Sequence, residues 1–285
     1  MAIDGEAGGV YDGEKEEKEG IPMNDYREIL KTMEAVVREA GAALMDRERS
    51  RRVHEKGYAD FVTEVDLQVQ TMVSQRLSSA FPEIQFMGEE QDNSDLDLSG
   101  ACWILDPVDG TSNLIHDLKM SAISLGLAVN RETVAGVIYQ PYLDEMFTAV
   151  KGGGAYLNGV PMHTSAPERL KDCIVGLGTA PYHHDLADKT FACAKEVFLH
   201  SMDIRRSGSA ALDLAYVAAG RLDAMFELIL QPWDFAAGRI IVEEAGGQMT
   251  HIDGEAVDVT VPGTILATNG KIHTELSALL CRTLL

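Results

Sequence analysis

The sequence predicts a mixed α/β protein in which layers of sheet are covered by helices. Helical periodicity opens the chain, a run of five strands follows, and from about residue 164 strands alternate with helices. A chain of 285 residues can bury one large core or two fused ones. We therefore expect two mixed halves, residues 23–165 and 166–285.

Residues 1–22 are expected to lie outside the fold. They are rich in Gly, Glu and Lys and include the run EKEEKE. Such a segment cannot bury enough apolar surface to offset the entropy of ordering it. The sequence therefore predicts an acidic, disordered extension before the first helix.

Two amphipathic helices begin the fold. Asn24 is a suitable N-cap for the first, whose apolar residues recur at helical spacing as far as Leu44. The second is expected over residues 67–79, after the segment DFVTEVD, with Asp66 as its cap. Four arginines lie between the helices, and we interpret them as a solvated helix end or a partner contact rather than a phosphate site: Arg47, Arg49, Arg51 and Arg52.

The remaining elements follow from changes in periodicity. Strands are expected over residues 84–87, 101–105, 121–130, 133–140 and 145–150, with a hairpin turn at residues 130–132. The second half should contain strands over residues 173–177, 202–205, 222–227, 248–252 and 264–267. Its helices are expected over residues 186–198, 209–219, 234–245 and 272–280. Residues 120–140 are apolar enough for a dimer interface, but a buried core is the favoured interpretation.

The segment WILDPVDGTSN carries the strongest functional signal. An apolar strand delivers Asp106 and Asp109 at its carboxyl end, and Gly110 allows a sharp bend. Thr111 and Ser112, which come next, are good helix N-cap residues. Two carboxylates beside a helix start can hold divalent cations, while free N–H groups receive phosphate oxygens. A plain strand-to-helix turn with an Asp cap would explain one of the two aspartates.

Further carboxylates lie at the ends of predicted elements. They are Asp66, Glu89 with Glu90, Glu227 and Asp234. Singly, each has an ordinary explanation as a helix cap or a solvated side chain. Together with the first two aspartates they would repel one another strongly unless cations separated them. Oxygen ligands without His or Cys select Mg²⁺, or Mn²⁺ as a substitute.

Composition excludes several classes of partner. The formal net charge of −21 disfavours nucleic-acid backbones and anionic membranes. The sequence has no run of 18 apolar residues, so we expect no transmembrane helix. It also lacks an apolar segment near the start, so we expect no signal peptide. The four cysteines form no CxxC pair, so we expect free thiols in a reducing compartment, the cytoplasm.

Four segments in order, DFVTEVD, GEE, DPVDGTSN and WDFAAGRIIVEEAGG, resemble the signatures of the inositol monophosphatase family. This family belongs to the lithium-sensitive, magnesium-dependent phosphatases, with fructose bisphosphatases and bisphosphate nucleotidases. The resemblance runs from about Asn24 to the C-terminus. It implies a layered α-β-α-β-α sandwich, a site between the two halves, two or three Mg²⁺ ions and a homodimer.

The resemblance also implies roles for individual residues. A first metal would be held by Glu89, Asp106 and the carbonyl of Val108, and a second by Asp106, Asp109 and Asp234; Glu89 would also touch a third, looser ion. Asp66 and Thr111 would orient the attacking water, near Glu90, and the N–H groups of Gly110 and Thr111 would hold phosphate. The substrate contacts would be Asp109, Ser209, Ala210, Glu227 and Asp234, with further candidates at Ser112 and, in a mobile loop, Lys56.

The segment after DGT indicates the substrate. Ser-Asn-Leu-Ile-His at residues 112–116 looks like the inositol-type branch of the family. We therefore expect hydrolysis of myo-inositol monophosphate by metal-activated water, without a covalent intermediate. One alternative is another activity at the same site, that of a fructose-1,6-bisphosphatase, a histidinol phosphatase or a bisphosphate nucleotidase. The other is a regulatory protein of this fold that binds a ligand without catalysis. The complete set of proposed ligands argues against the last.

Overall fold

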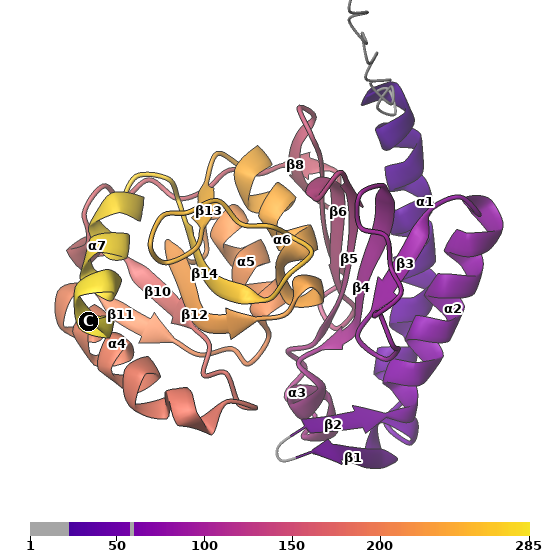
Figure 1. The fold of residues 1–285 in the computed structure, drawn as a ribbon, viewed down its shortest axis with the longest axis horizontal. Coiled ribbons are helices and arrows are strands. Elements are labelled where there is room, and N and C mark those ends of the chain that lie inside the picture. Colours follow the sequence, from indigo (N-terminus) through magenta and orange to yellow (C-terminus); the bar gives the residue numbers. More distant parts are fainter. Residues whose placement is uncertain (1–22, 58–59) are drawn as a thin grey trace, which may run out of the picture.

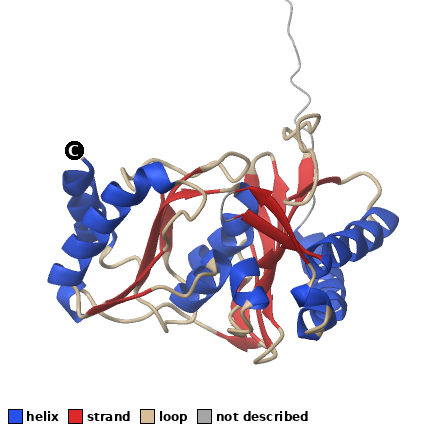
Figure 2. Ribbon diagram, turned by 90° about the horizontal axis from the view of Figure 1, so that it is seen from below, coloured by secondary structure: helices blue, strands red, loops and turns tan. Residues whose placement is uncertain are grey.

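The computed structural model describes residues 23–57 and 60–285, and the predicted extension of residues 1–22 lies outside them. Helices and sheets alternate in five layers (Figures 1 and 2). From one side to the other these are α1 with α2, a seven-stranded sheet, α5 with α6, a five-stranded sheet, and α4 with α7. The α-β-α-β-α arrangement expected for this sequence is therefore confirmed.

The first layer packs an amphipathic pair of helices on the large sheet. It contains α1 (Met23–Gly41) and α2 (Glu64–Ala80), joined through η1 (Ala42–Met45), η2 (Arg49–Arg51) and the hairpin of β1 (Val53–Gly57) with β2 (Asp60–Thr63). This hairpin was not predicted. Asn24 lies inside α1, which includes Met23, so it does not cap the helix.

Within the described residues, three of the four arginines between the first two helices bond other residues of the chain. Arg47 pairs with Asp117 and donates to the carbonyl of Leu114 at 2.7 Å, while Arg49 and Arg52 pair with nearby acids. Leu114 belongs to the short helix α3 (Thr111–Ile115). Arg47 therefore ties α3 to the first layer, a role that the sequence analysis did not anticipate.

The seven-stranded sheet has the order β3-β4-β5-β6-β7-β8-β9. Its strands are β3 (Gln85–Gly88), β4 (Ala101–Asp109), β5 (Ala122–Val129), β6 (Glu132–Gln140), β7 (Glu145–Val150), β8 (Gly154–Leu157) and β9 (Val160–Pro161). Helices cover both of its faces, which explains the unbroken apolar runs of β5 and β6. The core interpretation of residues 120–140 is thus confirmed, and the predicted hairpin turn forms with positive φ angles at Asn130 and Arg131.

The second sheet has the order β11-β10-β12-β14-β13. Its strands are β10 (Ile174–Leu177), β11 (Asp203–Arg205), β12 (Ala224–Leu230), β13 (Gln248–Thr250) and β14 (Gly263–Thr268). Two helices, α5 (Ala210–Ala218) and α6 (Pro232–Glu244), fill the space between the sheets. Two more, α4 (Ala187–His200) and α7 (His273–Leu284), cover the outer face of the second sheet. The connections contain η3 (Leu170–Asp172) and η4 (His184–Leu186). The proposed division of the chain at residue 165 falls between the strands of the two sheets.

Two predicted strand ends are wrong, and both matter for the site. β4 does not stop at Leu105 but continues to Asp109, through an irregular register that accommodates Pro107, which has no N–H to donate. β12 does not end at Glu227 but continues to Leu230, with another irregularity after Glu227. Asp106 and Asp109 therefore lie within a strand rather than in the loop that follows it, and Glu227 lies inside β12 rather than at its end.

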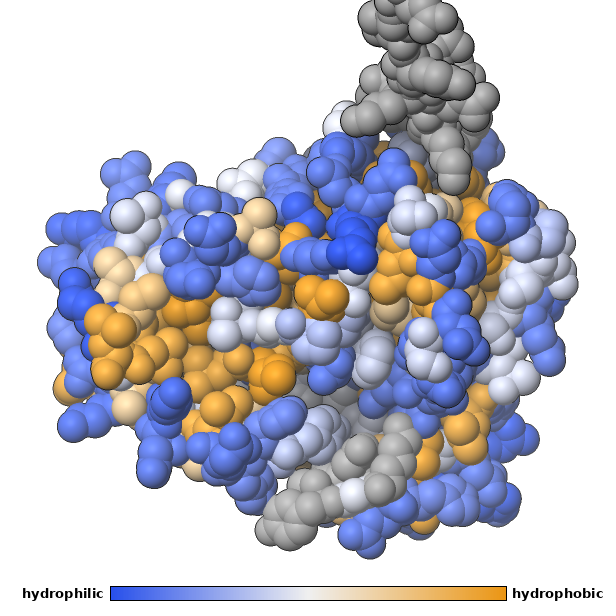
Figure 3. Space-filling model, viewed as in Figure 1, coloured by the Kyte–Doolittle hydropathy of each residue, from blue (hydrophilic) through white to orange (hydrophobic). Residues whose placement is uncertain are grey.

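The described residues include no helix that is long and apolar enough to cross a membrane. All four cysteines are free thiols, as expected. Large apolar side chains are exposed on and just after α4, at Phe191, Phe198, Leu199 and Met202. Figure 3 shows apolar surface on the left of the molecule, in the region of α4 and β11.

Candidate functional site

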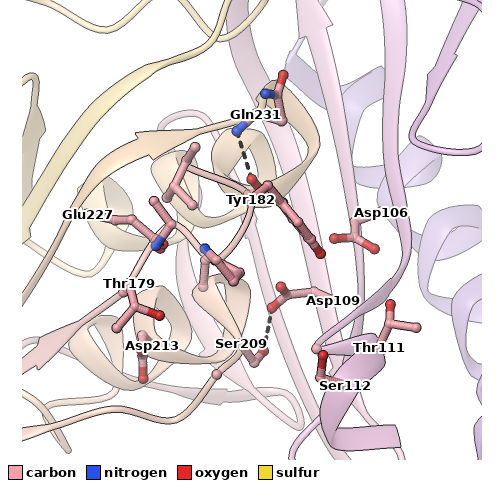
Figure 4. A pocket seen from close by; sticks show the side chains of 18 of the residues that line it. Asp106, Asp109, Thr111, Ser112, Thr179, Tyr182, Ser209, Asp213, Glu227 and Gln231 are labelled. Carbon is pink, nitrogen blue, oxygen red and sulfur yellow. Dashed lines mark hydrogen bonds between the residues drawn. The ribbon is translucent and has the colours of Figure 1, made fainter. Parts of the chain in front are cut away.

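A cleft of about 550 Å³ lies where the end of β4 meets α5, β12 and α6 (Figure 4). Its volume is in the range typical of small-molecule sites. Six acidic residues of the described part of the chain line it, and they come from both halves: Glu89, Asp106, Asp109, Asp213, Glu227 and Asp234. We call Asp106, Asp109 and Asp234 the acidic cluster, and Glu227, Asp213 and Arg206 the distal end of the cleft.

The irregular end of β4 positions two members of the acidic cluster. The register of β4 against β5 shifts between Asp106 and Asp109, so both carboxylates reach the cleft although they are three residues apart. The Oδ1 atom of Asp106 accepts a hydrogen bond from the backbone N–H of Val108 at 2.8 Å. The Oδ2 atom of Asp109 accepts from the Ser209 hydroxyl and from the N–H of Ala211 at 2.8 Å. Asp109 therefore also connects β4 to the start of α5.

The first turn of α6 brings in Asp234. Gln231 is the N-cap, and its N–H donates to Asp234 Oδ2 at 2.7 Å in a capping box. Asp234 is thus the third helical residue, not the cap that the sequence suggested. Ser124 of β5 donates to the carbonyl of Trp233 at 3.2 Å, which holds this turn against the large sheet. One ligand oxygen from each member of the acidic cluster lies within 4.8 Å of the others.

Glu89 reaches the same cleft from the neighbouring strand. β3 runs parallel to β4, and the N–H of Glu89 donates to the carbonyl of Leu105 at 3.2 Å. Glu89 lines the cleft, whereas Glu90 does not, and the N–H of Glu90 bonds Gln70 in α2 at 2.9 Å. The structure therefore separates two adjacent glutamates that the sequence left as a pair.

The electrostatics of the acidic cluster favour a bound cation. Burial raises the pKa of Asp106 well above its usual range, and the charges of Glu89, Asp109 and Asp234 raise it further. Burial also raises the pKa of Asp109 to about 6, although hydrogen bonds from Ser209 and Ala211 oppose the rise. The pKa of Asp234 is raised by burial and by Asp109. Among the described residues no Lys or Arg forms an ion pair with the three, so their charge needs another partner. Carboxylate oxygens without His or Cys suit Mg²⁺.

Thr111 and Asp66 form a second pair at the edge of the cleft. The Thr111 hydroxyl lies 3.1 Å from Asp66 Oδ1 and 3.0 Å from the carbonyl of Val108. Asp66 is fully buried and sits at the third position of α2, where it completes a capping box with Thr63, the true N-cap. The N-cap of α2 is therefore Thr63, three residues before the predicted Asp66. Burial raises the pKa of Asp66, while its hydrogen bonds from Thr63 lower it.

The turn between β4 and α3 depends on Gly110. Its φ of 88° lies in the left-handed region, and a Cβ there would come within 2.9 Å of the carbonyl oxygen of Met120. A glycine is therefore required for the chain to enter α3 at this angle. Thr111 and Ser112 follow in the cleft wall, as the sequence suggested.

The substrate contacts implied by the resemblance surround the other side of the cleft. Ser209 and Ala210 lie at the start of α5, and Glu227 faces them from within β12. Glu227 Oε1 accepts a hydrogen bond from the N–H of Ala180 at 2.8 Å. Lys56 falls in β1, but its side chain lies outside the described residues.

Two residues of the cleft were missed by the sequence analysis. Asp213 is a buried acid in the first turn of α5, and Arg206 precedes that helix. Asp213 could have been noticed because it is the one ionisable acid or base in the apolar segment AALDLAYVA. No local pattern marks Arg206.

A model of the inositol monophosphatase family matches residues 25–284. The chain belongs to this family. The family consists of phosphoric monoester hydrolases, and the resemblance noted in the four sequence segments is confirmed.

The proteins similar to this chain include inositol monophosphatases and a Nus factor. The inositol-1-monophosphatase of Mesorhizobium japonicum is 37% identical over 218 residues, covering 76% of this chain and 82% of that protein. The Nus factor SuhB of Escherichia coli is 37% identical over 221 residues, covering 76% of this chain and 81% of that protein. A crystal structure of a Staphylococcus aureus IMPase-II with inositol monophosphate bound has a TM-score of 0.75 and 30% identity, covering 88% of this chain and 92% of that one.

Proposed function

We propose that this protein hydrolyses a small phosphate monoester, with myo-inositol monophosphate as the preferred substrate, and that it requires Mg²⁺. One observation carries the proposal: three carboxylates from β4 and α6 place oxygens within 4.8 Å of one another in a cleft that also contains Thr111. The solved relative with inositol monophosphate bound supports the choice of substrate.

The residues of the acidic cluster fit two metal positions. Glu89, Asp106 and the Val108 carbonyl would hold one ion, and Asp106, Asp109 and Asp234 a second, with Glu89 available to a third. Ser209 and Ala211 both donate to Oδ2 of Asp109, and one oxygen of this carboxylate lies within 4.8 Å of oxygens of Asp106 and Asp234. When bound, Mg²⁺ would supply an activated water and neutralise the charge that develops on the leaving oxygen.

Thr111 and Asp66 are placed to move a proton. Thr111 forms part of the cleft wall and can accept a hydrogen bond from the attacking water while its own proton points to Asp66, 3.1 Å away. Because burial raises the pKa of Asp66, this carboxylate is a better proton acceptor than an exposed aspartate. The N–H groups of Gly110 and Thr111, at the start of α3, would hold phosphate oxygens. Ser209, Ala210 and Glu227 would contact the polyol.

Phosphate release from a substrate panel at several Mg²⁺ concentrations tests this proposal. The panel contains inositol 1-phosphate, fructose 1,6-bisphosphate, adenosine 3′,5′-bisphosphate and histidinol phosphate. We expect magnesium-dependent turnover that is fastest on inositol 1-phosphate. Faster turnover of another member would retain the chemistry and replace the substrate, whereas the absence of turnover on all four would contradict the proposal.

A regulatory role is the second candidate, because one relative of similar identity is named as a Nus factor. A binder without catalysis would have no need of the Thr111–Asp66 pair beside the acidic cluster. Magnesium-dependent turnover in the same panel therefore separates the two functions.

We also propose that the protein is a cytoplasmic homodimer that binds neither nucleic acid nor membrane. The free thiols support a reducing location, and the net charge of −21 supports a small-molecule rather than a polyanionic partner. The exposed apolar side chains of α4 support burial against another protein surface. Light scattering should then give twice the chain mass of 31.0 kDa.

A further inference from the structure

Asp213 has a buried oxygen that the protein itself does not satisfy. The residue is 2% exposed, and its Oδ1 atom has no hydrogen-bond partner among the described residues. Leaving a buried polar atom unpaired costs about 1–3 kcal/mol. The same residue lines the cleft, so a carboxyl group with an unpaired oxygen forms part of the cleft wall. Figure 4 shows Asp213 below Thr179, on the far side of Ser209 from Thr111.

Arg206 is the companion of Asp213 at the distal end. It is the one Lys or Arg in the described lining of the cleft, and its Nη2 atom donates to the Thr179 hydroxyl at 3.3 Å. Its charge lowers the pKa of both Asp213 and Glu227, although neither acid forms a close ion pair with it in the described structure. The guanidinium is therefore near two carboxyl groups and retains N–H donors for a ligand.

The wall opposite α5 is held tightly in place. Ala180 adopts a φ of 43°, a conformation that is costly for a residue with a Cβ, while its N–H binds Glu227. At Gly178 a Cβ would lie only 1.8 Å from Glu227 Oε2. This loop and Glu227 thus fix one side of the distal end, and Asp213 and Arg206 form the other.

We propose that Asp213 and Arg206 determine specificity for the leaving group, with Asp213 binding a hydroxyl of the polyol and Arg206 donating to a second oxygen of the same ring. The proposal rests on the phosphatase function proposed above. Hydroxyls suit this end because each can donate to a carboxyl oxygen and accept from an N–H. A second phosphate suits this end less well, since Arg206 is the one Lys or Arg among the described lining residues that could balance a dianion there.

The protonation of Asp213 is consistent with this role. Burial raises the pKa of Asp213 to about 8, whereas the hydrogen bond of Ser207 lowers it. At neutral pH the side chain is then mainly a neutral acid, which can donate as well as accept a hydrogen bond. An amide in the same place would retain both capacities.

Substrates with and without hydroxyls on the leaving group test the proposal. We would measure kcat and KM of the magnesium-loaded protein for inositol 1-phosphate and for p-nitrophenyl phosphate, whose leaving group carries no hydroxyl apart from the one released. For Asp213→Ala we expect kcat/KM to fall about 10- to 100-fold on inositol 1-phosphate, mainly through KM, and less than about 3-fold on p-nitrophenyl phosphate. Asp213→Asn should retain most of the activity on both.

Two further variants control for structural effects. Asp223 is a buried acid of the same half that bonds Ser165 and Ile174 and does not line the cleft, so Asp223→Ala should leave the ratio of the two substrates unchanged. Arg206 is exposed, so Arg206→Gln should fold, and we expect a smaller loss, about 3- to 10-fold, confined to inositol 1-phosphate. Melting temperatures of all variants identify any that fail to fold, and Arg206→Gln decides if Asp213→Ala does not fold.

Equal losses on both substrates, or no loss on inositol 1-phosphate, would overturn the proposal. So would a wild-type preference for fructose 1,6-bisphosphate that Arg206→Gln abolishes, because Arg206 would then bind a phosphate. A wild-type protein that hydrolyses neither test substrate nor any member of the earlier panel would instead contradict the phosphatase function itself.

Discussion

Local backbone structure fixes the acidic cluster, whereas packing between distant elements forms the distal end of the cleft. Asp106 and Asp109 are placed by the irregular end of one strand, and Asp234 by the capping box of one helix. At the distal end, Glu227 lies within a strand, Asp213 within a helix, and the loop that closes on them contains a residue at positive φ. Each carboxylate of the acidic cluster is therefore oriented by its own element, although β4 and α6 must pack together to form the cluster.

This difference separates two kinds of variant. Changes in the acidic cluster should lower the turnover of every substrate by a similar factor. Changes at the distal end should alter the ratio between substrates, as described for Asp213. Three predictions, from the largest expected effect to the smallest, examine this division.

Asp106→Asn should have the largest effect. The side chain keeps its volume but loses the charge shared by both proposed metal positions, so we expect folded protein whose kcat/KM falls by about 10³-fold or more on inositol 1-phosphate and p-nitrophenyl phosphate alike. Asp253→Asn, on an exposed turn outside the cleft, is the matched control and should keep full activity. Retained activity in Asp106→Asn would mean that this aspartate is not the shared ligand.

Magnesium should raise the melting temperature of the protein. A ligand at 100 times its dissociation constant stabilises the folded state by about 2.7 kcal/mol, which corresponds to a shift of several degrees. The shift should be much smaller in Asp106→Asn and unchanged in Asp213→Asn, because only the first residue belongs to the acidic cluster. Differential scanning fluorimetry with EDTA and with millimolar MgCl₂ measures this shift in melting temperature. Equal shifts in both variants would contradict the assignment of Mg²⁺ to the acidic cluster rather than the distal end.

Without divalent cations, the stability of the protein should fall as the pH rises from about 5 to 8. Burial raises the pKa of Glu227 to about 7 and that of Asp213 to about 8, so both carboxyls bind protons more tightly folded than unfolded. The stability due to protonation is complete below the unfolded pKa near 4 and is lost as the pH approaches the folded pKa. Each such group contributes a slope of about 1.4 kcal/mol per pH unit within that window.

Asp213→Asn in EDTA should flatten this decline, since the amide does not titrate. Urea unfolding at pH 5, 6, 7 and 8 gives the slope for the wild type and the variant, and Asp253→Asn again serves as the control. A slope that Asp213→Asn leaves unchanged would show that Asp213 titrates normally in the folded protein.

How far the sequence predicts the site depends on where each residue lies. Asp106 to Thr111 are contiguous and Glu89 and Asp234 sit beside element ends, so residue type and periodicity were sufficient to identify them. The capping pattern at α2 was misread by three positions because Thr63 and Asp66 are both good capping residues, and only the backbone shows which one starts the helix. The five layers followed from the resemblance, since periodicity alone gave only helices covering sheets.

The distal end could not be predicted in the same way. Asp213, Arg206 and Ala180 come from a helix, a loop and another loop, and nothing in the sequence indicates that they meet. Lys56 is the opposite case, a residue to which the resemblance assigned a role. Its side chain lies outside the described residues, so that role stays a prediction. Motif reading therefore identified the acidic cluster and Glu227 but missed Asp213 and Arg206.

Three of the hydrogen bonds that join the two halves lie at the end of β4 and in α3, which follows it. Asp109 accepts from Ser209 and Ala211, and Asn113 donates to the carbonyl of Ser207 at 3.0 Å, so the seven-stranded half is joined to the segment leading into α5. A hinge motion that moved one sheet away from the other would have to break these bonds, two of which are accepted by a carboxylate of the acidic cluster. We therefore expect the distance between the two sheets to stay constant throughout a catalytic cycle. Substrate would then bind to, and product leave, a preformed cleft.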